Sequence, residues 1–378
     1  MKKMALIIPL EIEEFHLYKD VGEVPYYLSK NYNVECEIVH LGNGLSGNFR
    51  SVKLIPRKGF MSKLRKIPGL GGIFYSIRLL TYLIKHAKKI DVLMLFHFSK
   101  FNFLAVILYK LMNSKGKIYN KLDLDPCNIE QKNNKITVKK YINFVDLFSV
   151  ETLVAYEKIK HNFHGFDIDD KLLYLPNGFD EDLIAENEIE INDFKDKENL
   201  IITVGRLGAH EKITEMILRA IETLDLKDWK VALVGPICNG FEKVIEEFYI
   251  KYPEKKSTVI FMDNITDKKI LMDYYNRAKV FLLTSRRESF GIVLNEALYF
   301  GNYIITTNVG AAIDITNNGQ FGTVIKNNNS EDLKQVLTLV INEEINLETE
   351  YNKAIQHSNQ YFVWENLCKN KSFEQLFE

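Results

Sequence analysis

The sequence predicts an α/β protein made of two doubly wound domains. Short apolar stretches alternate with segments of helical periodicity through both halves of the 378-residue chain. Alternation of this kind is typical of parallel sheets joined by right-handed helical crossovers. The chain is long enough for two cores, and an acidic, polar stretch at 181–199 separates the two alternating series. We therefore expect two domains joined by a linker and facing a central cleft in which a ligand binds.

Each half supplies one series of expected elements. In the first half we expect helices that include 73–87 and 101–112, and strands at 5–9, 35–40, 92–96, 117–122, 147–150 and 172–175. In the second half we expect strands at 200–204, 230–234, 258–261, 280–283, 303–306 and 322–325. Both series fit a Rossmann-like domain, whose ligands bind beyond the carboxyl ends of the strands.

Composition and charge narrow the class of protein. The formal net charge is −1, which does not indicate a general affinity for nucleic acid. The four cysteines are far apart, so neither a zinc site nor a disulfide framework is expected, and a cytoplasmic location fits. No apolar run approaches the ~20 residues that span a bilayer. The apolar start of the chain is short and acidic residues follow it, so we expect a buried first strand rather than a signal peptide.

The stretch 50–89 differs from the rest of the chain in charge. No acidic residue lies between Glu37 and Asp91, whereas basic side chains recur there and alternate with apolar ones. A basic, partly amphipathic surface suits an anionic membrane or a phosphate-bearing lipid acceptor. The alternative is a solvated basic loop followed by a helix packed on the core. RNA binding is a weaker hypothesis, because no RNA-binding signature accompanies the charge.

The segment 281–301 carries the strongest functional signal. An apolar strand pattern ends at Thr284, and a helical pattern begins after Gly291 and ends near Gly301. The N–H groups of the first helical turn, which starts at Ile292, make an anion site. Gly291 has no side chain, so a phosphate can approach the backbone closely there.

Two carboxylates flank this anion site, Glu288 before the helix and Glu296 about one turn inside it. Carboxylates repel phosphates, but they accept hydrogen bonds from sugar hydroxyls. The combination predicts a nucleotide-sugar pocket, with the phosphates at the helix N-terminus and the hydroxyl groups at the carboxylates. The alternative is an ordinary strand–turn–helix with two solvated glutamates.

A second polar stretch follows the strand expected at 200–204. Arg206 comes directly after Gly205, and Lys212 lies at the start of the next helical segment. An arginine fork and a lysine point charge at a strand end are suited to a diphosphate. The alternative is a surface pair of cations bound to Glu211 and Glu215.

Together the two stretches resemble the retaining GT-B glycosyltransferases, in particular those of family 4. Residues 288–296 match the Glu-x7-Glu signature, and residues 205–212 match a Gly-Arg-Leu…Lys motif. Smaller matches lie at 175–180, 234–236, 261–265, 308–312 and 362–365. The resemblance extends from about Leu175 to the C-terminus.

The resemblance implies the GT-B fold. An acceptor-binding domain is expected at 1–180, a nucleotide-sugar-binding domain at 181–358, and a C-terminal helix at 359–378 that crosses back to the first domain. Arg206 and Lys212 are implied to hold the donor pyrophosphate and to stabilise the leaving nucleoside diphosphate. Since these cations handle the phosphate charge, neither a metal ion nor another cofactor is expected. The other implied donor-side residues are Gly235, Ile265, Glu288, Ser289, Phe290, Gly291, Ile292 and Glu296.

The first domain resembles the family only in layout. Many members have a Gly-Gly pair after the first strand, where this chain has the single, late Gly22. Many also have a histidine at the place of Asp123, and we expect Asp123 and Lys121 to face the reacting sugar or the acceptor hydroxyl. His97, at the end of the preceding strand, is another acceptor-side candidate, with a purely structural role as the alternative.

The sequence thus predicts a cytoplasmic, membrane-associated glycosyltransferase that retains the configuration of the sugar. We expect a nucleotide-sugar donor, UDP-linked, and a lipid-linked or polymeric glycan acceptor in cell-surface polysaccharide or glycoconjugate assembly. One alternative is a non-catalytic GT-B partner subunit that binds glycan or protein. Another is a nucleotide-sugar enzyme of the same fold, such as an epimerase.

Overall fold

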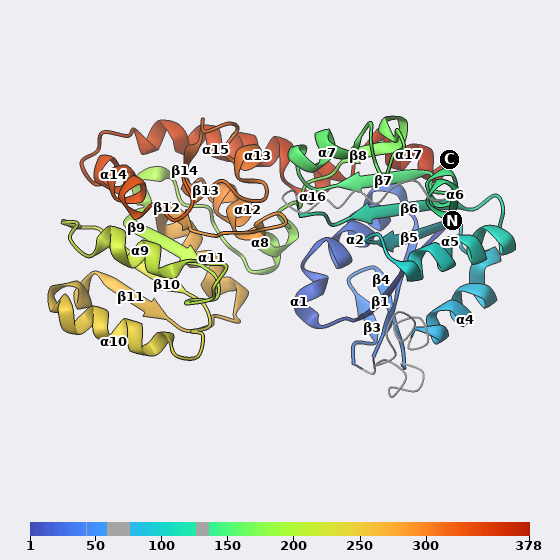
Figure 1. Ribbon diagram of the computed structural model, residues 1–378, viewed down its shortest axis with the longest axis horizontal. Helices are drawn as coiled ribbons and strands as arrows, with labels where there is room; N and C mark the ends of the chain where they lie inside the picture. Colours follow the sequence, from blue (N-terminus) through green and yellow to red (C-terminus); the bar gives the residue numbers. More distant parts are fainter. Residues whose placement is uncertain (43, 59–75, 126–135) are drawn as a thin grey trace. The chain divides into compact units, whose positions relative to one another are not determined.

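A computed structural model describes residues 1–42, 44–58, 76–125 and 136–378. The chain forms two compact units. Unit 1 comprises Met1–Asp180 and Trp364–Glu378, and unit 2 comprises Glu181–Val363. Each unit has one mainly parallel sheet with helices on both faces (Figure 1). In the parts of the chain that the structure describes, no helix combines the length and the apolar character needed to cross a membrane.

The sheet of unit 1 has the order β3-β4-β2-β1-β5-β6-β7-β8. All neighbouring strands run parallel except β3, which is antiparallel to β4. The strands are β1 (Lys3–Glu11), β2 (Glu35–Leu41), β3 (Gly47–Phe49), β4 (Val52–Arg57), β5 (Val92–Phe96), β6 (Lys117–Leu122), β7 (Leu147–Val150) and β8 (Leu172–Tyr174). The six strands expected in this half are confirmed.

The short strands β3 and β4 were not expected. Residues 50–58 belong to the stretch interpreted as a basic surface or loop, but most of them lie in β4, paired with β2 through Ile38 and Leu54. Residues 59–75 of the same stretch lie outside the described residues. The helix expected at 73–87 is observed from Ile77 to His86.

The helices of unit 1 divide between the two faces of the sheet because side chains alternate along each strand. Ala5 and Ile7 of β1 face one apolar core, while Leu6 and Ile8 face another. The first core is covered by α4 (Ile77–His86), α5 (Lys100–Met112), α6 (Ile136–Phe144) and α7 (Leu153–Ile159). The second is covered by α2 (Asp20–Tyr32) and α17 (Lys371–Phe377). Shorter helices are α1 (Glu14–Leu17), η2 (Ala87–Lys89), η3 (Asp169–Lys171) and α16 (Trp364–Leu367).

The sheet of unit 2 is parallel throughout and has the order β11-β10-β9-β12-β13-β14. The strands are β9 (Glu198–Val204), β10 (Lys230–Val234), β11 (Val259–Met262), β12 (Ala278–Leu283), β13 (Tyr303–Thr307) and β14 (Gly322–Ile325). All six were expected, with bounds that differ by at most two residues. The order is that of dinucleotide-binding sheets, with the first strand in the middle.

Helices cover both faces of this second sheet as well. The main ones are α9 (Thr214–Ile221), α10 (Phe241–Lys251), α11 (Lys268–Arg277), α12 (Ile292–Tyr299), α14 (Ser330–Ile341) and α15 (Leu347–Tyr361). Shorter ones are α8 (Asp182–Glu186), η4 (Phe194–Asp196), η5 (Pro253–Ser257) and α13 (Ala312–Ile315).

The acidic stretch 181–199 is part of unit 2 rather than a free linker, which corrects the sequence-based interpretation. It contains α8, η4 and the start of β9. The Asn192 N–H donates to the side-chain oxygen of Asn276 at 2.9 Å, and the Asn192 carbonyl accepts from Tyr351 Oη at 2.6 Å. Side chains of α11 and α15 thus hold this stretch through its backbone.

Candidate functional site

The expected donor-side residues gather at one edge of the unit 2 sheet. Because the strands are parallel, their carboxyl ends lie at the same edge. The chain order reverses between β9 and β12: β10 and β11 lie on one side of β9, and β12 to β14 on the other. Such a switch point is where parallel sheets usually bind ligands. The residues after β9 and β12 are 205–213 and 284–291, the two stretches singled out from the sequence.

Gly235 allows the backbones after β9 and β10 to come together. Its φ is +136°, and a Cβ at this position would lie 2.0 Å from the carbonyl oxygen of Gly205. Any side chain at 235 would therefore force the strand ends apart. Gly205 and Gly235 each donate an N–H to the neighbouring strand, to Val234 and Met262. The backbones of Gly205 and Gly235 thus form a surface without side chains beside Arg206, which we call the glycine floor.

Lys212 lies across the glycine floor. Its Cδ and Cε are 3.6 Å from where a Gly205 Cβ would be, so the aliphatic stem packs over the glycine. Its Nζ is 2.5 Å from Glu288 Oε1, and the two side chains are 19% and 15% exposed. The structure thus joins the two sequence motifs through an ion pair at the switch point. Glu288 was not among the carboxylates expected to pair with a cation.

The loop that carries Lys212 is held firmly. Thr284 Oγ1 donates to the Lys212 carbonyl at 3.1 Å, and the Arg286 N–H donates to the Glu211 carbonyl at 2.8 Å. Ile213, the next residue, has φ +43°, a conformation that is costly for a β-branched side chain. The Ile213 side chain is only 6% exposed and packs in the core, which holds the strained backbone in place. Strain of this kind at a loop tip is common where a functional side chain must be positioned.

Arg206 has a more open setting than Lys212. Its side chain is 59% exposed, and its guanidinium pairs with the carboxylate of Glu211. The pairing with Glu211 agrees with the alternative prediction of surface cations bound to neighbouring glutamates. A surface pair of this type contributes little to stability, so the guanidinium can exchange one anionic partner for another.

Glu288 also accepts a hydrogen bond from Ser285. Ser285 Oγ lies 2.6 Å from the same Oε1 that contacts Lys212. The Ser285 backbone is fixed in turn by Thr307 at the end of β13, whose Oγ1 accepts from the Ser285 N–H at 3.0 Å. Neither Ser285 nor Thr307 was expected as a site residue. Ser285 lies three residues before Glu288 in the sequence, which was a signal, whereas the contact of Thr307 with Ser285 depends on the fold.

The N-terminus of α12 is built as the sequence predicted. Gly291 is the N-cap with φ +91°, and α12 starts at Ile292. The buried Phe290 anchors the loop, and its carbonyl accepts from the Ala311 N–H at 2.8 Å. A Cβ on Gly310 would lie 2.3 Å from that carbonyl, so a small residue is required there. The first N–H groups of α12 consequently lie at the carboxyl edge, as an anion site requires.

Glu296 lies one turn into α12 and is partly buried. Its Oε2 accepts from Tyr275 Oη at 2.7 Å. Burial, followed by the nearby Glu296 charge, raises the pKa of Tyr275 well above its usual value, so the phenol stays a donor. Tyr275 belongs to α11 and carried no sequence signal as a site residue. Of the remaining expected residues, Ser289 is exposed in the 284–291 loop and Ile265 follows β11 at the same edge.

The acceptor-side candidates lie at the carboxyl edge of the unit 1 sheet. His97 follows β5 and Asp123 follows β6, and these strands are neighbours. His97 Nδ1 is 3.9 Å from Asp123 Oδ2, and both side chains are partly exposed. The backbone of His97 has φ +64°, and its carbonyl accepts from Asn102 and Asn120 at 2.9 and 3.1 Å. The structure therefore brings these two candidates together.

Lys121 does not face a ligand at this edge, contrary to the expectation. Its side chain is fully buried, with Nζ 3.2 Å from Asp20 and 3.6 Å from Glu151. Burial opposes its charge, but Asp20 and Glu151 raise its pKa above the usual value. Burial also raises the pKa of Glu151 well above its usual value, and Asn177 donates to this carboxyl group at 2.7 Å. The buried lysine thus joins β6 to α2 and to the end of β7, and Glu151 extends this link to Asn177.

Gly22 lies inside helix α2 rather than in a loop that contacts a ligand. A Cβ there would be 2.1 Å from the carbonyl oxygen of Leu17. The glycine is therefore explained by the close approach of α1 and α2.

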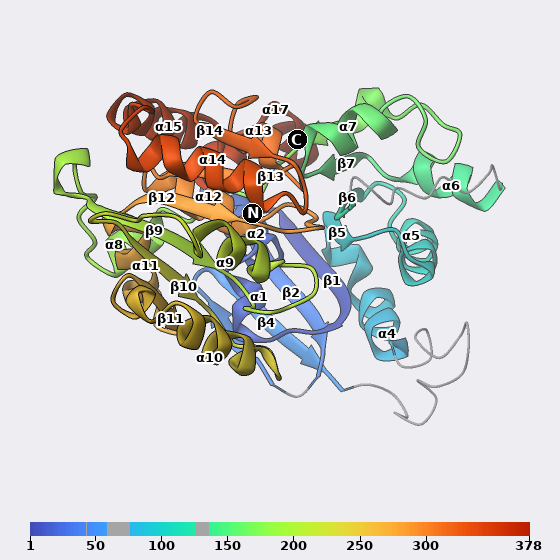
Figure 2. The same cartoon turned by 60° about the vertical axis from the view of Figure 1, so that its left-hand side comes forward.

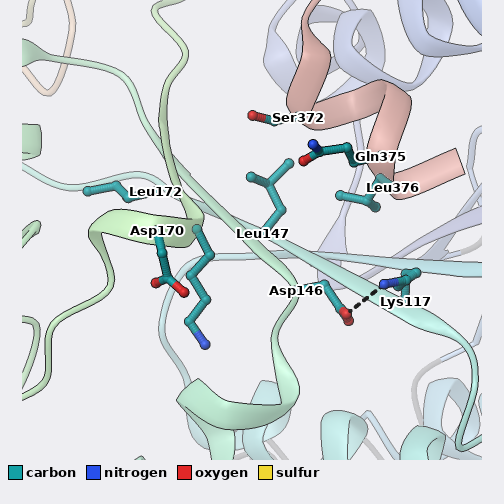
Figure 3. A pocket seen from close by; sticks show the side chains of 9 residues that line it. Lys117, Asp146, Leu147, Asp170, Leu172, Ser372, Gln375 and Leu376 are labelled. Carbon is teal, nitrogen blue, oxygen red and sulfur yellow. Dashed lines mark ion pairs between the residues drawn. The ribbon is translucent and has the colours of Figure 1, made fainter. Parts of the chain in front are cut away.

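A pocket of about 170 Å³ in unit 1 lies away from these residues. It is formed by the amino ends of β6, β7 and β8 and by α17 (Figure 3). Lys117 and Asp146 form an ion pair of 3.3 Å at its wall. The pocket includes none of the predicted site residues and lies at the sheet edge opposite to the one where parallel sheets bind ligands.

The comparison with protein families concerns unit 2. Residues 185–358 match the model of the family described as glycosyl transferases group 1. This region contains both sequence motifs and the whole switch-point edge.

Curated relatives match a similar portion. The chain is 27% identical over 168 residues to "Capsular polysaccharide biosynthesis glycosyltransferase CapM" of Staphylococcus aureus, covering 43% of each protein. It is 30% identical over 178 residues to an α-1,4-N-acetyl-D-galactosaminyltransferase of Campylobacter jejuni, covering 46% of this chain and 45% of the relative. The full name of that relative gives a diNAcBac-PP-undecaprenol-linked saccharide as its substrate. The matched segment spans less than half the length of these relatives.

Solved structures match almost the whole chain at low sequence identity. Anabaena HepE, solved in complex with UDP, has a TM-score of 0.68 at 15% identity and 98% coverage of both chains. A glycosyltransferase of Rickettsia africae has a TM-score of 0.73 at 16% identity, covering 100% of this chain and 99% of its own. The fold is that of the GT-B glycosyltransferases, and the family match supports a glycosyltransferase as the class of protein.

Proposed function

We propose that the protein is a retaining glycosyltransferase, similar to family 4, that uses a UDP-linked sugar. The observation that carries this proposal is the meeting of Lys212 and Glu288 at the switch point of unit 2, with Arg206 beside them. Two cations and a helix N-terminus suit a diphosphate, and the carboxylates suit hydroxyl groups. The UDP bound to HepE supports the choice of nucleotide.

The proposed chemistry is electrostatic. The bond between the anomeric carbon and the β-phosphate oxygen breaks, and negative charge grows on the departing diphosphate. Arg206, Lys212 and the N–H groups at the start of α12 stabilise that charge. The leaving β-phosphate oxygen accepts the proton of the acceptor hydroxyl, which attacks the same face of the sugar. Because protein cations stabilise the leaving group, we propose that no metal ion is needed.

We assign Glu288 to the hydroxyls of the donor sugar and Glu296 to those of the ribose. In the structure each carboxylate has a partner, Lys212 for Glu288 and Tyr275 for Glu296. Binding of a diphosphate sugar would let Lys212 contact a phosphate while Glu288 accepts from the sugar. Ser285 would hold Glu288 in place during this exchange.

On the acceptor side we propose that Asp123 and His97 contribute through the carboxyl edge of unit 1. The acceptor is proposed to be a lipid-linked or polymeric glycan in cell-surface polysaccharide assembly. The names of the Staphylococcus and Campylobacter relatives support this class. We further propose that the enzyme acts in the cytoplasm, at the membrane surface.

The experiment that tests the function is a thermal-shift panel of nucleotide sugars followed by product analysis. A ligand that binds only the folded state raises the melting temperature, so the true donor should do so. Transfer or slow hydrolysis of that donor, with the anomeric configuration read by NMR, then tests the retaining mechanism. Replacement of Arg206 by Ala should slow transfer by orders of magnitude at saturating donor. Unchanged turnover would contradict its assigned role.

The same panel separates the alternatives. A non-catalytic partner subunit would bind no nucleotide sugar or would leave it intact. An epimerase would change the sugar without releasing UDP. Release of UDP together with a glycosylated product excludes both.

A further inference from the structure

Helix α5 of unit 1 packs on the core with one side and leaves apolar side chains exposed on another. The covered face packs into the core through Phe101, Ala105 and Tyr109. The other face carries residues spaced i, i+3, i+4, i+7 and i+8, which places them on one side of the helix. They are Leu104, Ile107, Leu108, Leu111 and Met112. Leu104 and Leu108 are partly buried and pack against the core, so they form the inner border of this side. Ile107, Leu111 and Met112 are 40%, 70% and 40% exposed.

The helices beside α5 continue this surface. Helix α4 contacts α5 on one side and α6 contacts it on the other, and Figures 1 and 2 show the three in sequence along unit 1. All three pack on the same face of the sheet, so their outer sides belong to one side of the unit. Ile84 of α4 is 44% exposed, and Ile136 and Phe144 of α6 are 79% and 38% exposed. Apolar side chains therefore recur across the outer sides of three adjacent helices.

The charge of these helices has a single sign. None of the three contains an acidic residue, although the chain as a whole has 50 acidic and 49 basic residues. Exposed lysines accompany the apolar side chains, namely Lys85 on α4, Lys100 on α5, and Lys139 and Lys140 on α6. Lys110 of α5 is instead used internally, since it contacts Asp146 at 3.5 Å. We call the exposed apolar and lysine side chains of α4, α5 and α6 the basic apolar face.

We propose that the basic apolar face docks unit 1 on an anionic membrane surface. The lysines would contact lipid phosphates, and the apolar side chains would enter the boundary between headgroups and acyl chains. Exposed apolar residues mixed with lysine differ from protein interfaces, which favour aromatic residues and arginine and are poor in lysine. The charge and the chemistry of the face therefore favour a lipid surface over a protein partner.

This location differs from the one expected from sequence. The stretch 50–89 was the candidate membrane surface, but its described first part forms β4 of the sheet. Only α4 is shared with the basic apolar face, and most of the face comes from residues 100–112 and 136–144. The inference is compatible with the proposed use of a lipid-linked acceptor, but it does not depend on the donor site in unit 2.

The test is flotation of the full chain with phosphatidylcholine vesicles that contain or lack phosphatidylglycerol. The wild-type protein should float with the anionic vesicles, and high salt should release it because salt screens the lysines. Each lysine near an anionic surface contributes about 1 kcal/mol, so K139E/K140E should weaken partitioning by a factor of about 30 or more. Leu111→Asn, which removes the most exposed apolar side chain of α5, should weaken it several-fold.

Matched controls lie in unit 2. K195E/K243E makes the same change of charge, and Ile250→Asn replaces a side chain that is 79% exposed. Both controls should float like the wild type, and all variants should melt near the wild-type temperature because the changed side chains are exposed. The donor-site variant R206A should also float normally, so a failure of the proposed enzymatic function would leave this result intact.

Several outcomes would overturn the proposal. Equal binding to both kinds of vesicle, or none to either, would do so. Equal losses in K139E/K140E and K195E/K243E would show that overall charge, not this face, governs binding. A wild-type dimer that Leu111→Asn dissociates, in a chain that does not float, would assign the face to a second copy of the protein.

Discussion

Replacement of Lys212 by methionine tests the contribution of its ammonium charge, which we assign to the donor diphosphate. Methionine keeps an unbranched stem that can pack over Gly205, where Lys212 Cδ and Cε now lie. The change removes the ammonium that contacts Glu288 at 2.5 Å. A hydrogen bond to a charged group contributes about 1.5–3 kcal/mol, so UDP binding should weaken by about 10- to 150-fold.

The same substitution leaves the Glu288 carboxylate, 15% exposed, without its cationic partner. At an effective dielectric constant of about 20, a carboxylate and a phosphate charge about 5 Å apart repel each other by up to about 3 kcal/mol. Part of the loss in K212M should therefore come from Glu288. The double variant K212M/E288Q should bind UDP more tightly than K212M, while remaining weaker than E288Q alone.

Isothermal titration calorimetry of UDP at constant pH and salt measures these differences. Lys195→Met is the matched control, since this lysine lies in unit 2, its side chain is 74% exposed, and its Nζ is 3.9 Å from Asp193 Oδ2. It should bind UDP like the wild type. A K212M variant within twofold of wild type would refute the assignment of Lys212 to the diphosphate. Equal affinities of K212M and K212M/E288Q would refute the coupling to Glu288.

Four further predictions test other parts of the account. Burial lowers the pKa of Lys197 to about 7, so between about pH 7 and 10 the unfolded state binds more protons than the folded state. In denaturant titrations the stability of the wild type should therefore rise with pH relative to Lys197→Met, by up to about 1.4 kcal/mol per pH unit. Parallel stability profiles of the two proteins would contradict the lowered pKa. Gly235→Ala should destabilise the protein by more than Gly240→Ala, because both glycines have positive φ but only Gly235 faces a backbone oxygen at 2.0 Å; equal melting temperatures would count against this packing. Glu296→Gln should lose discrimination between UDP and 2′-deoxy-UDP in calorimetry, and an unchanged ratio would remove the ribose assignment. EDTA should leave donor turnover unchanged, and a loss restored by Mg²⁺ would contradict the metal-independent mechanism.

Strand positions were predictable because each buried parallel strand is a compact apolar run between polar segments. Sequence patterns located β5, β6, β7 and β10 to the residue. The hairpin of β3 and β4 was missed for a physical reason. Strand β4 reads Val-Lys-Leu-Ile-Pro-Arg, in which charged residues and Pro56 interrupt the apolar pattern, and its antiparallel partner has only three residues. The short β3 pairs with β4 only as far as Leu54, so Pro56 lies where β4 has β2 as its one paired neighbour, and such an edge position tolerates proline.

The donor-side motifs were predictable because their spacing reflects local structure. Gly291 and the apolar spacing after Ile292 are local signals of a helix start, and Arg206 follows a strand end. The pairing of Lys212 with Glu288 links residues 76 positions apart and requires the strand order β9–β12, which the sequence alone does not specify. Tyr275 reaches Glu296 for the same kind of reason.

The acceptor-side residues show most clearly which contacts could not be predicted from the sequence. Lys121 follows the alternation of β6, and a lysine near a strand end was expected to reach a ligand. Its burial depends on Asp20 and Glu151, which come from helix α2 and the end of β7. Such carboxylates allow a buried lysine to keep its charge, and their proximity is a tertiary property.

Hydrogen–deuterium exchange of the full chain, with and without UDP, tests the central claim most directly. If the carboxyl edge of unit 2 binds the nucleotide, UDP should slow exchange in the two segments 205–213 and 288–296, and it should do so less in K212M at the same concentration. Protection confined to unit 1, or to the amino ends of the unit 2 strands, would contradict the account.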